Sequence, residues 1–250
     1  MKHLKDIEQR LPGFWKDGYL APVDLLSAEE VAEGTRAYVD CLERMQRDNS
    51  LTFTHKSEDD SGNETKVHQI RAAHLQHPFF DRLIRDERIL DIAEAIIGPN
   101  IRLTLCQGLY KAPGTGGEIQ WHQDDYYFRA SKENAVVSCW LTFDDATVDN
   151  GCMWLLQGSH GEFQEHVRPV ENKPAIIPQV DDSKAVPIEL KAGQALFHHG
   201  SAAHRTLPNT TDTHRRAIAM HYMDSTAHLS GQWGHDEPPE NMPLLRGVAA

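Results

Sequence analysis

The stretch that indicates the fold is VVSCWLTF, residues 136–143, which is rich in β-branched and aromatic side chains and precedes the acidic turn 144–145. A short apolar run bounded by turn residues is typical of a buried strand. Further runs of this kind lie at 101–105, 152–156, 187–190, 195–199 and 216–223. Glycines stand in several of the turns between them. Short strands with such turns predict an antiparallel sandwich or barrel.

Helical signals dominate the residues before this region. Ser27 and Glu30 form a capping box, and apolar residues then recur at roughly helical spacing. Pro78 opens a short apolar helix, and residues 89–97 form another that ends at Gly98-Pro99. We therefore expect one α+β domain over 1–250, with a mainly helical part at 1–100, a β core at 101–225 and an irregular tail at 226–250. The polar stretch 48–66 and the proline-bearing stretch 164–186 are expected to be loops that close over a site.

Composition excludes several classes of partner. The chain has 250 residues, with 25 Lys+Arg against 37 Asp+Glu and a net charge of -12. This balance argues against nonspecific nucleic-acid binding and against an anionic membrane surface. No apolar run approaches the roughly 20 residues that cross a bilayer, and the first residues lack the apolar segment of a secretory signal. Four cysteines without a C-x-x-C pair fit a reduced compartment, so we expect a cytoplasmic protein. The oligomeric state stays open.

The segment Trp121-His122-Gln123-Asp124 carries the chemistry. Residues i and i+2 of a strand point to the same side, so His122 and Asp124 can aim an imidazole and a carboxylate at one point. His204 is the best candidate for a third ligand, because it follows the predicted strand 195–199. Two histidines and one carboxylate form the facial triad of non-haem Fe(II) oxygenases. In a chain with 15 histidines, however, an H-x-D triplet can also arise by chance.

Residues after His204 strengthen the metal hypothesis. Arg215 lies eleven residues further on and can return to the same pocket along a strand, where its guanidinium would bind a carboxylate bidentately. Thr206, two residues past His204, can add a hydroxyl donor to the same carboxylate. The neighbouring Arg216 is expected to face away, because adjacent strand residues alternate.

With these motifs the sequence resembles the phytanoyl-CoA dioxygenase family of Fe(II)/2-oxoglutarate-dependent oxygenases. The ordered set that carries the resemblance is Phe14-Trp15-Lys16-Asp17-Gly18-Tyr19, Tyr110-Lys111-Ala112-Pro113-Gly114, Trp121-His122-Gln123-Asp124, Asn150-Gly151-Cys152, Gln157-Gly158-Ser159-His160 and His204…Pro208-Asn209…Arg215. It runs through most of the chain. Gln157 departs from the family pattern, which more often has proline there, but this concerns a turn.

The resemblance implies a double-stranded β-helix core, a jelly roll of the cupin-like type, with N-terminal helices packed against it. It implies Fe(II), 2-oxoglutarate and O2 as cofactor and cosubstrates, with His122, Asp124 and His204 as iron ligands. Arg215 and Thr206 map onto the site of the 2-oxoglutarate C5 carboxylate. Two further residues fall where family members line the cosubstrate pocket, namely Lys111 and Trp140.

The implied reaction is hydroxylation of an unactivated C–H bond of a small metabolite, with release of succinate and CO2. A carboxylate ligand favours hydroxylation over halogenation, while desaturation and ring closure remain open because they share the same hydrogen abstraction. Candidate substrate residues are Gln120, Tyr127 and Arg129. One of His198 and His199 at most is expected to point into the barrel. Two alternatives remain: a cupin-type metalloenzyme that does not use 2-oxoglutarate, and a non-catalytic binding module on the same fold.

Overall fold

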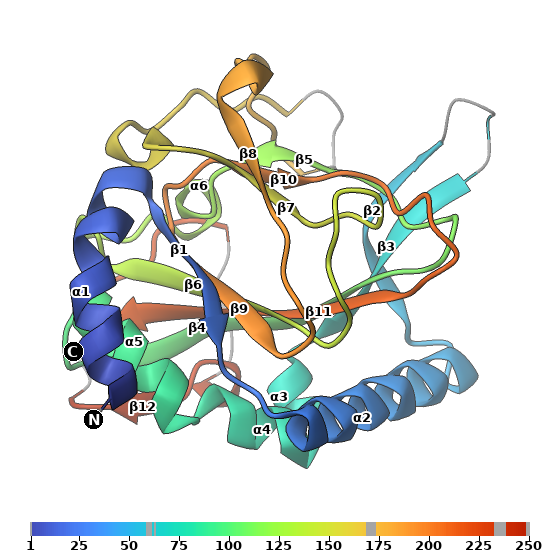
Figure 1. The fold of residues 1–250 in the computed structure, drawn as a ribbon, viewed down its shortest axis with the longest axis horizontal. Helices are drawn as coiled ribbons and strands as arrows, with labels where there is room; N and C mark the ends of the chain where they lie inside the picture. Colours follow the sequence, from blue (N-terminus) through green and yellow to red (C-terminus); the bar gives the residue numbers. More distant parts are fainter. Residues whose placement is uncertain (1, 59–61, 63, 169–173, 233–238, 249–250) are drawn as a thin grey trace.

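Two antiparallel sheets form the centre of the protein (Figure 1). The computed structural model describes residues 2–58, 62, 64–168, 174–232 and 239–248. The larger sheet has eight strands, in the order β1-β9-β6-β11-β4-β3-β2 with β12 beside β4, and the smaller sheet has the order β5-β10-β7-β8. The strand bounds are β1 Tyr19–Asp24, β2 Thr52–Glu58, β3 Glu64–Arg71, β4 Ile101–Lys111, β5 Ile119–His122, β6 Val136–Thr142, β7 Met153–Leu156, β8 Ala185–Ile188, β9 Gln194–His199, β10 His204–Thr206, β11 Arg215–Asp224 and β12 Leu244–Arg246. This arrangement confirms the predicted sheet-rich core.

Helices cover one face of the larger sheet, at the left and lower edges of Figure 1. Their bounds are α1 Lys2–Asp17, α2 Ala28–Arg47, α3 Ala73–Gln76, α4 Pro78–Ile84, α5 Glu87–Ile97 and α6 Asp125–Phe128. The predicted capping box starts α2: Glu30 N donates to Ser27 Oγ over 3.3 Å, and Ser27 N donates to Glu30 Oε2 over 2.7 Å. Of the six, α6 follows β5 directly, and its Phe128 packs with Val136 and Met223 of the larger sheet.

Strand β11 shows how the core is divided. Ile218 and Met220 belong to the apolar cluster between the larger sheet and the helices. Ala217 and Ala219 belong to a second cluster between the two sheets. Because strand residues alternate between faces, every second residue of β11 faces the space between the sheets. The functional site lies in that space.

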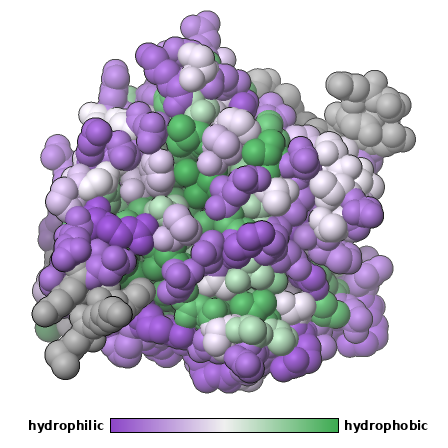
Figure 2. Space-filling model, viewed as in Figure 1, coloured by the Kyte–Doolittle hydropathy of each residue, from purple (hydrophilic) through white to green (hydrophobic). Residues whose placement is uncertain are grey.

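The hydropathy of the surface fits this layered core. On the face drawn in Figure 2, hydrophobic side chains are visible over the strands and near α2, and hydrophilic side chains surround them. None of the helices that the structure describes is both long and apolar enough to cross a membrane.

Three segments that were expected to lack strands contain strands or a strand bridge. The stretch 48–66 contains most of a hairpin, β2–β3, in which β3 also pairs with β4. Its strands are mostly polar because they lie at the sheet edge, so the alternation that would reveal them is weak. In the stretch 164–186, Val167 and Ile176 form a bridge, while 169–173 lie outside the described residues. The tail, expected to be irregular, contributes strand β12 to the larger sheet.

Candidate active site

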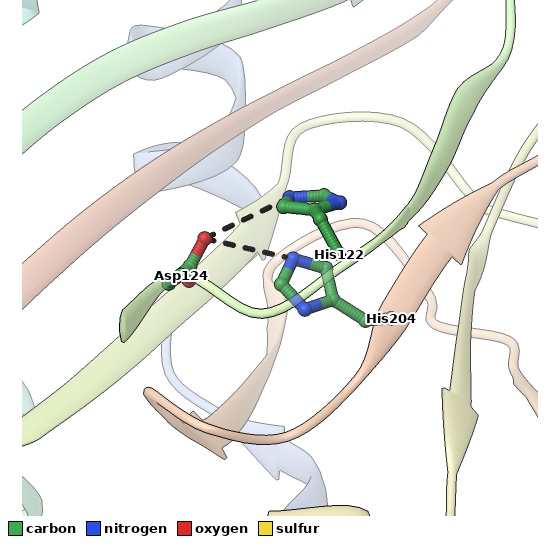
Figure 3. A group of neighbouring side chains, drawn as sticks. All are labelled: His122, Asp124 and His204. Carbon is green, nitrogen blue, oxygen red and sulfur yellow. Dashed lines mark ion pairs between the residues drawn. The ribbon is translucent and has the colours of Figure 1, made fainter. Parts of the chain in front are cut away.

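The three predicted iron ligands meet at one end of the smaller sheet (Figure 3). His122 ends β5 and His204 begins β10, and the two residues are direct partners in this antiparallel pair. Asp124 lies in the turn between β5 and α6. One ligand atom from each residue lies within 4.8 Å of the others. Pairing of β5 with β10 therefore brings together residues that are far apart in the sequence.

One oxygen of Asp124 faces both imidazoles. Its Oδ1 is 3.7 Å from His122 Nε2 and 3.8 Å from His204 Nε2. The Asp124 side chain is almost completely buried. Burial alone would raise the pKa of this carboxyl, but the surrounding imidazoles, His221 foremost, hold that pKa well below its usual range. Asp124 is thus present as the carboxylate, the form that binds metals.

Backbone carbonyls select the tautomer of both histidines. His122 Nδ1 is 2.8 Å from Gln120 O, and His204 Nδ1 is 2.9 Å from Ala202 O. A carbonyl oxygen can only accept, so each Nδ1 carries a hydrogen, and in the neutral form of each ring the Nε2 lone pair is directed toward Asp124. This is the arrangement that metal-binding histidines adopt. Two neutral imidazole nitrogens and one carboxylate oxygen fit a divalent iron ion.

The three predicted ligands line a cavity, and a fully buried cation lines it with them. Arg215, at the start of β11, lines this cavity together with the three predicted ligands and Trp140. Its Nη1 donates to Leu109 O over 3.2 Å, whereas Nε and Nη2 are buried and have no partner among the described residues. Burial lowers the pKa of Arg215 to about 10, so the guanidinium remains charged at neutral pH. Two unused N–H groups on a buried cation fit a bidentate carboxylate.

The other predicted cosubstrate residues surround this guanidinium. Thr206 lines the cavity, and its buried hydroxyl also has no partner in the described part of the chain. Trp140 places its ring 5.5 Å from the Arg215 guanidinium carbon. Lys111 is the strand partner of Arg215, but its ammonium donates to Leu207 O and does not line the cavity. Burial, with Arg215 nearby, lowers the pKa of Lys111 well below its ordinary value.

The predicted substrate residues lie in three different surroundings. Gln120 is exposed and lies outside the cavity lining. The prediction that Gln120 shares a face with His122 is wrong because β5 contains a bulge. In this bulge, the four residues Ile119–His122 lie opposite the three residues His204–Thr206. Both ends of that bulge, Ile119 and His122, face the cavity instead.

Tyr127 and Arg129, which follow the turn that bears Asp124, lie in different surroundings. Tyr127 is buried, its ring centroid lies 6.2 Å from that of His122, and its hydroxyl donates to Ala175 O over 2.9 Å. Arg129 is exposed and lines a second hollow of about 660 Å³. That hollow is also lined by Asp125 and His199, the chain neighbours of Asp124 and His198.

Sequence reasoning did not assign a role to three polar residues beside the predicted ligands. His198 and His221 line the cavity, and Ser138 contacts both Asp124 and His221. The alternation of β9 predicted that at most one of His198 and His199 points inward, and in the structure His198 lines the cavity. His221 shares the inner face of β11 with Arg215, a signal available once the strand is recognised. As predicted, Arg216 faces away and pairs with Asp144.

Comparison with known proteins agrees with this site. A family model described as phytanoyl-CoA dioxygenase (PhyH) matches residues 14–217. The chain belongs to the phytanoyl-CoA dioxygenase family. This match confirms the predicted family.

Relatives within the phytanoyl-CoA dioxygenase family match over part of their length. Phytanoyl-CoA dioxygenase domain-containing protein 1 of Danio rerio is 29% identical over 163 residues, which cover 62% of this chain and 56% of that protein. The Rattus norvegicus protein of the same name is 28% identical over 193 residues, covering 70% of this chain and 66% of that protein. The chain thus spans little more than half of the zebrafish relative.

Solved structures match over nearly the whole chain. The non-heme monooxygenase ThoJ, in its apo form, is 25% identical with a TM-score of 0.73, covering 97% of this chain and 84% of its own. The epimerase SnoN, solved with Fe3+, α-ketoglutarate and nogalamycin RO, is 23% identical with a TM-score of 0.75, covering 97% and 99%. These likenesses confirm the predicted jelly-roll fold.

Proposed function

We propose that the protein is an Fe(II)- and 2-oxoglutarate-dependent oxygenase that hydroxylates an unactivated C–H bond of a small metabolite. The observation that carries the proposal is the buried Arg215, whose two unused N–H groups share one cavity with His122, Asp124 and His204. A cupin metalloenzyme that did not use 2-oxoglutarate would have no need for such a cation. An unpaired buried charge costs free energy unless a ligand neutralises it.

Each end of the cavity has a distinct role in this proposal. His122, Asp124 and His204 would hold the iron. Arg215 and the Thr206 hydroxyl would bind the far carboxylate of 2-oxoglutarate and so orient the cosubstrate. When bound, iron and 2-oxoglutarate supply the oxidation, in which O2 is consumed and succinate and CO2 are released. The protein contributes position and a cavity that excludes water.

The inferred reaction type rests on the carboxylate ligand, and the inferred substrate class rests on the net charge. Asp124 provides the carboxylate, and halogenating relatives have a small residue at that position, so we infer hydroxylation. The chain has a net charge of -12 and no evident basic cluster for a CoA phosphate tail, which favours a smaller metabolite. Of the candidate substrate residues, Arg129 is the one whose side chain lines an open hollow.

An anaerobic titration tests the proposal directly. The apoprotein is titrated with Fe(II) and then with 2-oxoglutarate, and the weak visible charge-transfer band of a chelated 2-oxo acid is recorded. We expect the band only with both additions, and we expect its loss in Arg215→Ala but not in Arg216→Ala. Iron binding without the band would favour a cupin enzyme independent of 2-oxoglutarate. Absence of iron binding would favour a binding module.

Removal of a ligand provides a second test. Asp124→Ala should abolish succinate formation, because the remaining pair of imidazoles cannot hold iron well. Unchanged turnover in that variant would refute the assignment of the three ligands.

A further inference from the structure

The two oxygens of Asp124 have different surroundings. Oδ1 faces the two histidine ligands, as described above. Oδ2 lies 3.0 Å from Ser138 Oγ, 3.4 Å from His221 Nδ1 and 3.9 Å from His198 Nε2. All of these side chains are almost fully buried. One carboxylate oxygen is thus directed at the metal position and the other at a polar cluster.

The hydrogen bonds of this cluster have a definite direction. A carboxylate only accepts, so Ser138 donates its single hydroxyl hydrogen to Asp124 Oδ2. Ser138 Oγ must then accept from His221 Nδ1, which lies 2.7 Å away and therefore carries a hydrogen. His198 Nδ1 lies 3.2 Å from the carbonyl of His199, so the neutral ring brings no hydrogen to Asp124. Ser138 is therefore the donor to Asp124 Oδ2, and His221 orients the Ser138 hydroxyl by donating to it.

The position of Asp124 makes such support necessary. His122 and His204 belong to paired strands, whereas Asp124 lies in a turn and makes no capping hydrogen bond to α6. Ser138 and His221 are direct partners across β6 and β11, two inner strands of the larger sheet. Their hydrogen bonds therefore fix a turn of the smaller sheet against a rigid part of the larger one.

We propose that Ser138 and His221 are positioning residues that hold Asp124 Oδ2 and leave Oδ1 as the single oxygen for the metal. The inference rests on the metal centre of the proposed function. A carboxylate that is free to turn can bind a metal through both oxygens and occupy one more coordination position. Engaging Oδ2 keeps that position open for the 2-oxo acid and O2.

Cobalt(II) alone serves as the probe, because its visible absorption reports coordination number. Apoprotein variants are titrated anaerobically with Co(II), without 2-oxoglutarate. Ser138→Ala and His221→Leu should lower Co(II) affinity by about 10–100-fold and weaken the visible bands, as expected for lost orienting partners. His221→Asn places an amide N–H near the position of Nδ1, so it should restore the native spectrum.

A matched control separates positioning from general damage. Thr104 lies on β4, is buried and donates to the backbone carbonyl of His221, so Thr104→Val removes a hydroxyl bound to the same residue without touching the imidazole. It should lower the melting temperature and leave the Co(II) spectrum native.

Three results would overturn the inference. They are native Co(II) affinity and spectrum in Ser138→Ala, equal spectral changes in Thr104→Val, and a loss in His221→Asn as large as in His221→Leu. Since the assay contains neither 2-oxoglutarate nor O2, its outcome is independent of the oxygenase proposal.

Discussion

Replacing Arg215 by methionine should weaken cosubstrate binding strongly while leaving the stability of the ligand-free protein nearly unchanged. In the ligand-free protein, two buried N–H groups of the guanidinium lack partners in the described residues, at a cost of about 1–3 kcal/mol each. Against this stand one hydrogen bond to Leu109 O, worth about 1.5–3 kcal/mol, and a contact with the Trp140 ring, worth about 0.5–2 kcal/mol. The terms nearly cancel, so Arg215→Met should change the ligand-free stability by about 1 kcal/mol or less.

Binding of 2-oxoglutarate should suffer far more. Removing one partner of a buried ion pair costs about 3–5 kcal/mol, which corresponds to a loss of about 10²–10⁴-fold in affinity. At 100 times its Kd a ligand stabilises the native state by about 2.7 kcal/mol. We therefore expect 2-oxoglutarate to raise the melting temperature of the Co(II)-loaded native protein by several degrees and that of the variant hardly at all.

Thermal unfolding with and without 2-oxoglutarate checks both parts. The control is Arg216→Met, because Arg216 faces the opposite side of β11 and binds Asp144 over 2.6 and 2.8 Å. It should destabilise the protein equally in both conditions and leave the 2-oxoglutarate shift unchanged. A full shift in Arg215→Met, or a ligand-free destabilisation as large as that of Arg216→Met, would refute the reasoning.

Three further predictions concern other parts of the fold. Burial lowers the pKa of His199 to about 4, so the unfolded chain takes up a proton between about pH 6.5 and 4 while the folded protein does not. The free energy of unfolding should therefore fall by about 3 kcal/mol less in His199→Gln than in the native protein when the pH is lowered over that range. Urea unfolding at pH 7 and pH 4.5 measures this difference. Gly34→Ala places a Cβ against a buried phenylalanine ring and should cost about 1–3 kcal/mol, whereas Gly13→Ala meets open space in a helix and should gain about 1 kcal/mol, both read from melting temperatures. Asp182→Ala removes an acceptor 2.9 Å from Trp121 Nε1 and should speed proteolysis within 174–185 without altering Co(II) binding.

The sequence was sufficient to group the predicted iron ligands, because the proposed chemistry requires these residue types in this order. The H-x-D segment, His204 and the eleven-residue step to Arg215 identified residues that the structure places in one cavity. The helix starts at Ser27 and Pro78 were also predictable, since capping and proline act locally.

The remaining features depend on contacts that no local pattern reveals. Periodicity predicted that Gln120 shares a face with His122, but a bulge in β5 shifts the alternation. The hairpin β2–β3 was not predicted because its strands carry no alternating apolar pattern. Backbone pairing of β3 with β4, at the edge of the sheet, holds the hairpin in place. Alternation along β11 could place His221 on the same face as Arg215, but only its pairing with Ser138 shows that it lies beside Asp124.

The pairing of His122 with His204 has a consequence for synthesis of the chain. When synthesis has reached residue 124, the chain contains two of the three predicted ligands. The third, His204, is added 80 residues later, and Arg215 is added after it. Strand β10, which bears His204, pairs with β5 and β7, and both precede it in the chain. The proposed iron site therefore becomes complete only when β10 has been synthesised and has paired with β5, so an unfinished chain would lack the full set of ligands.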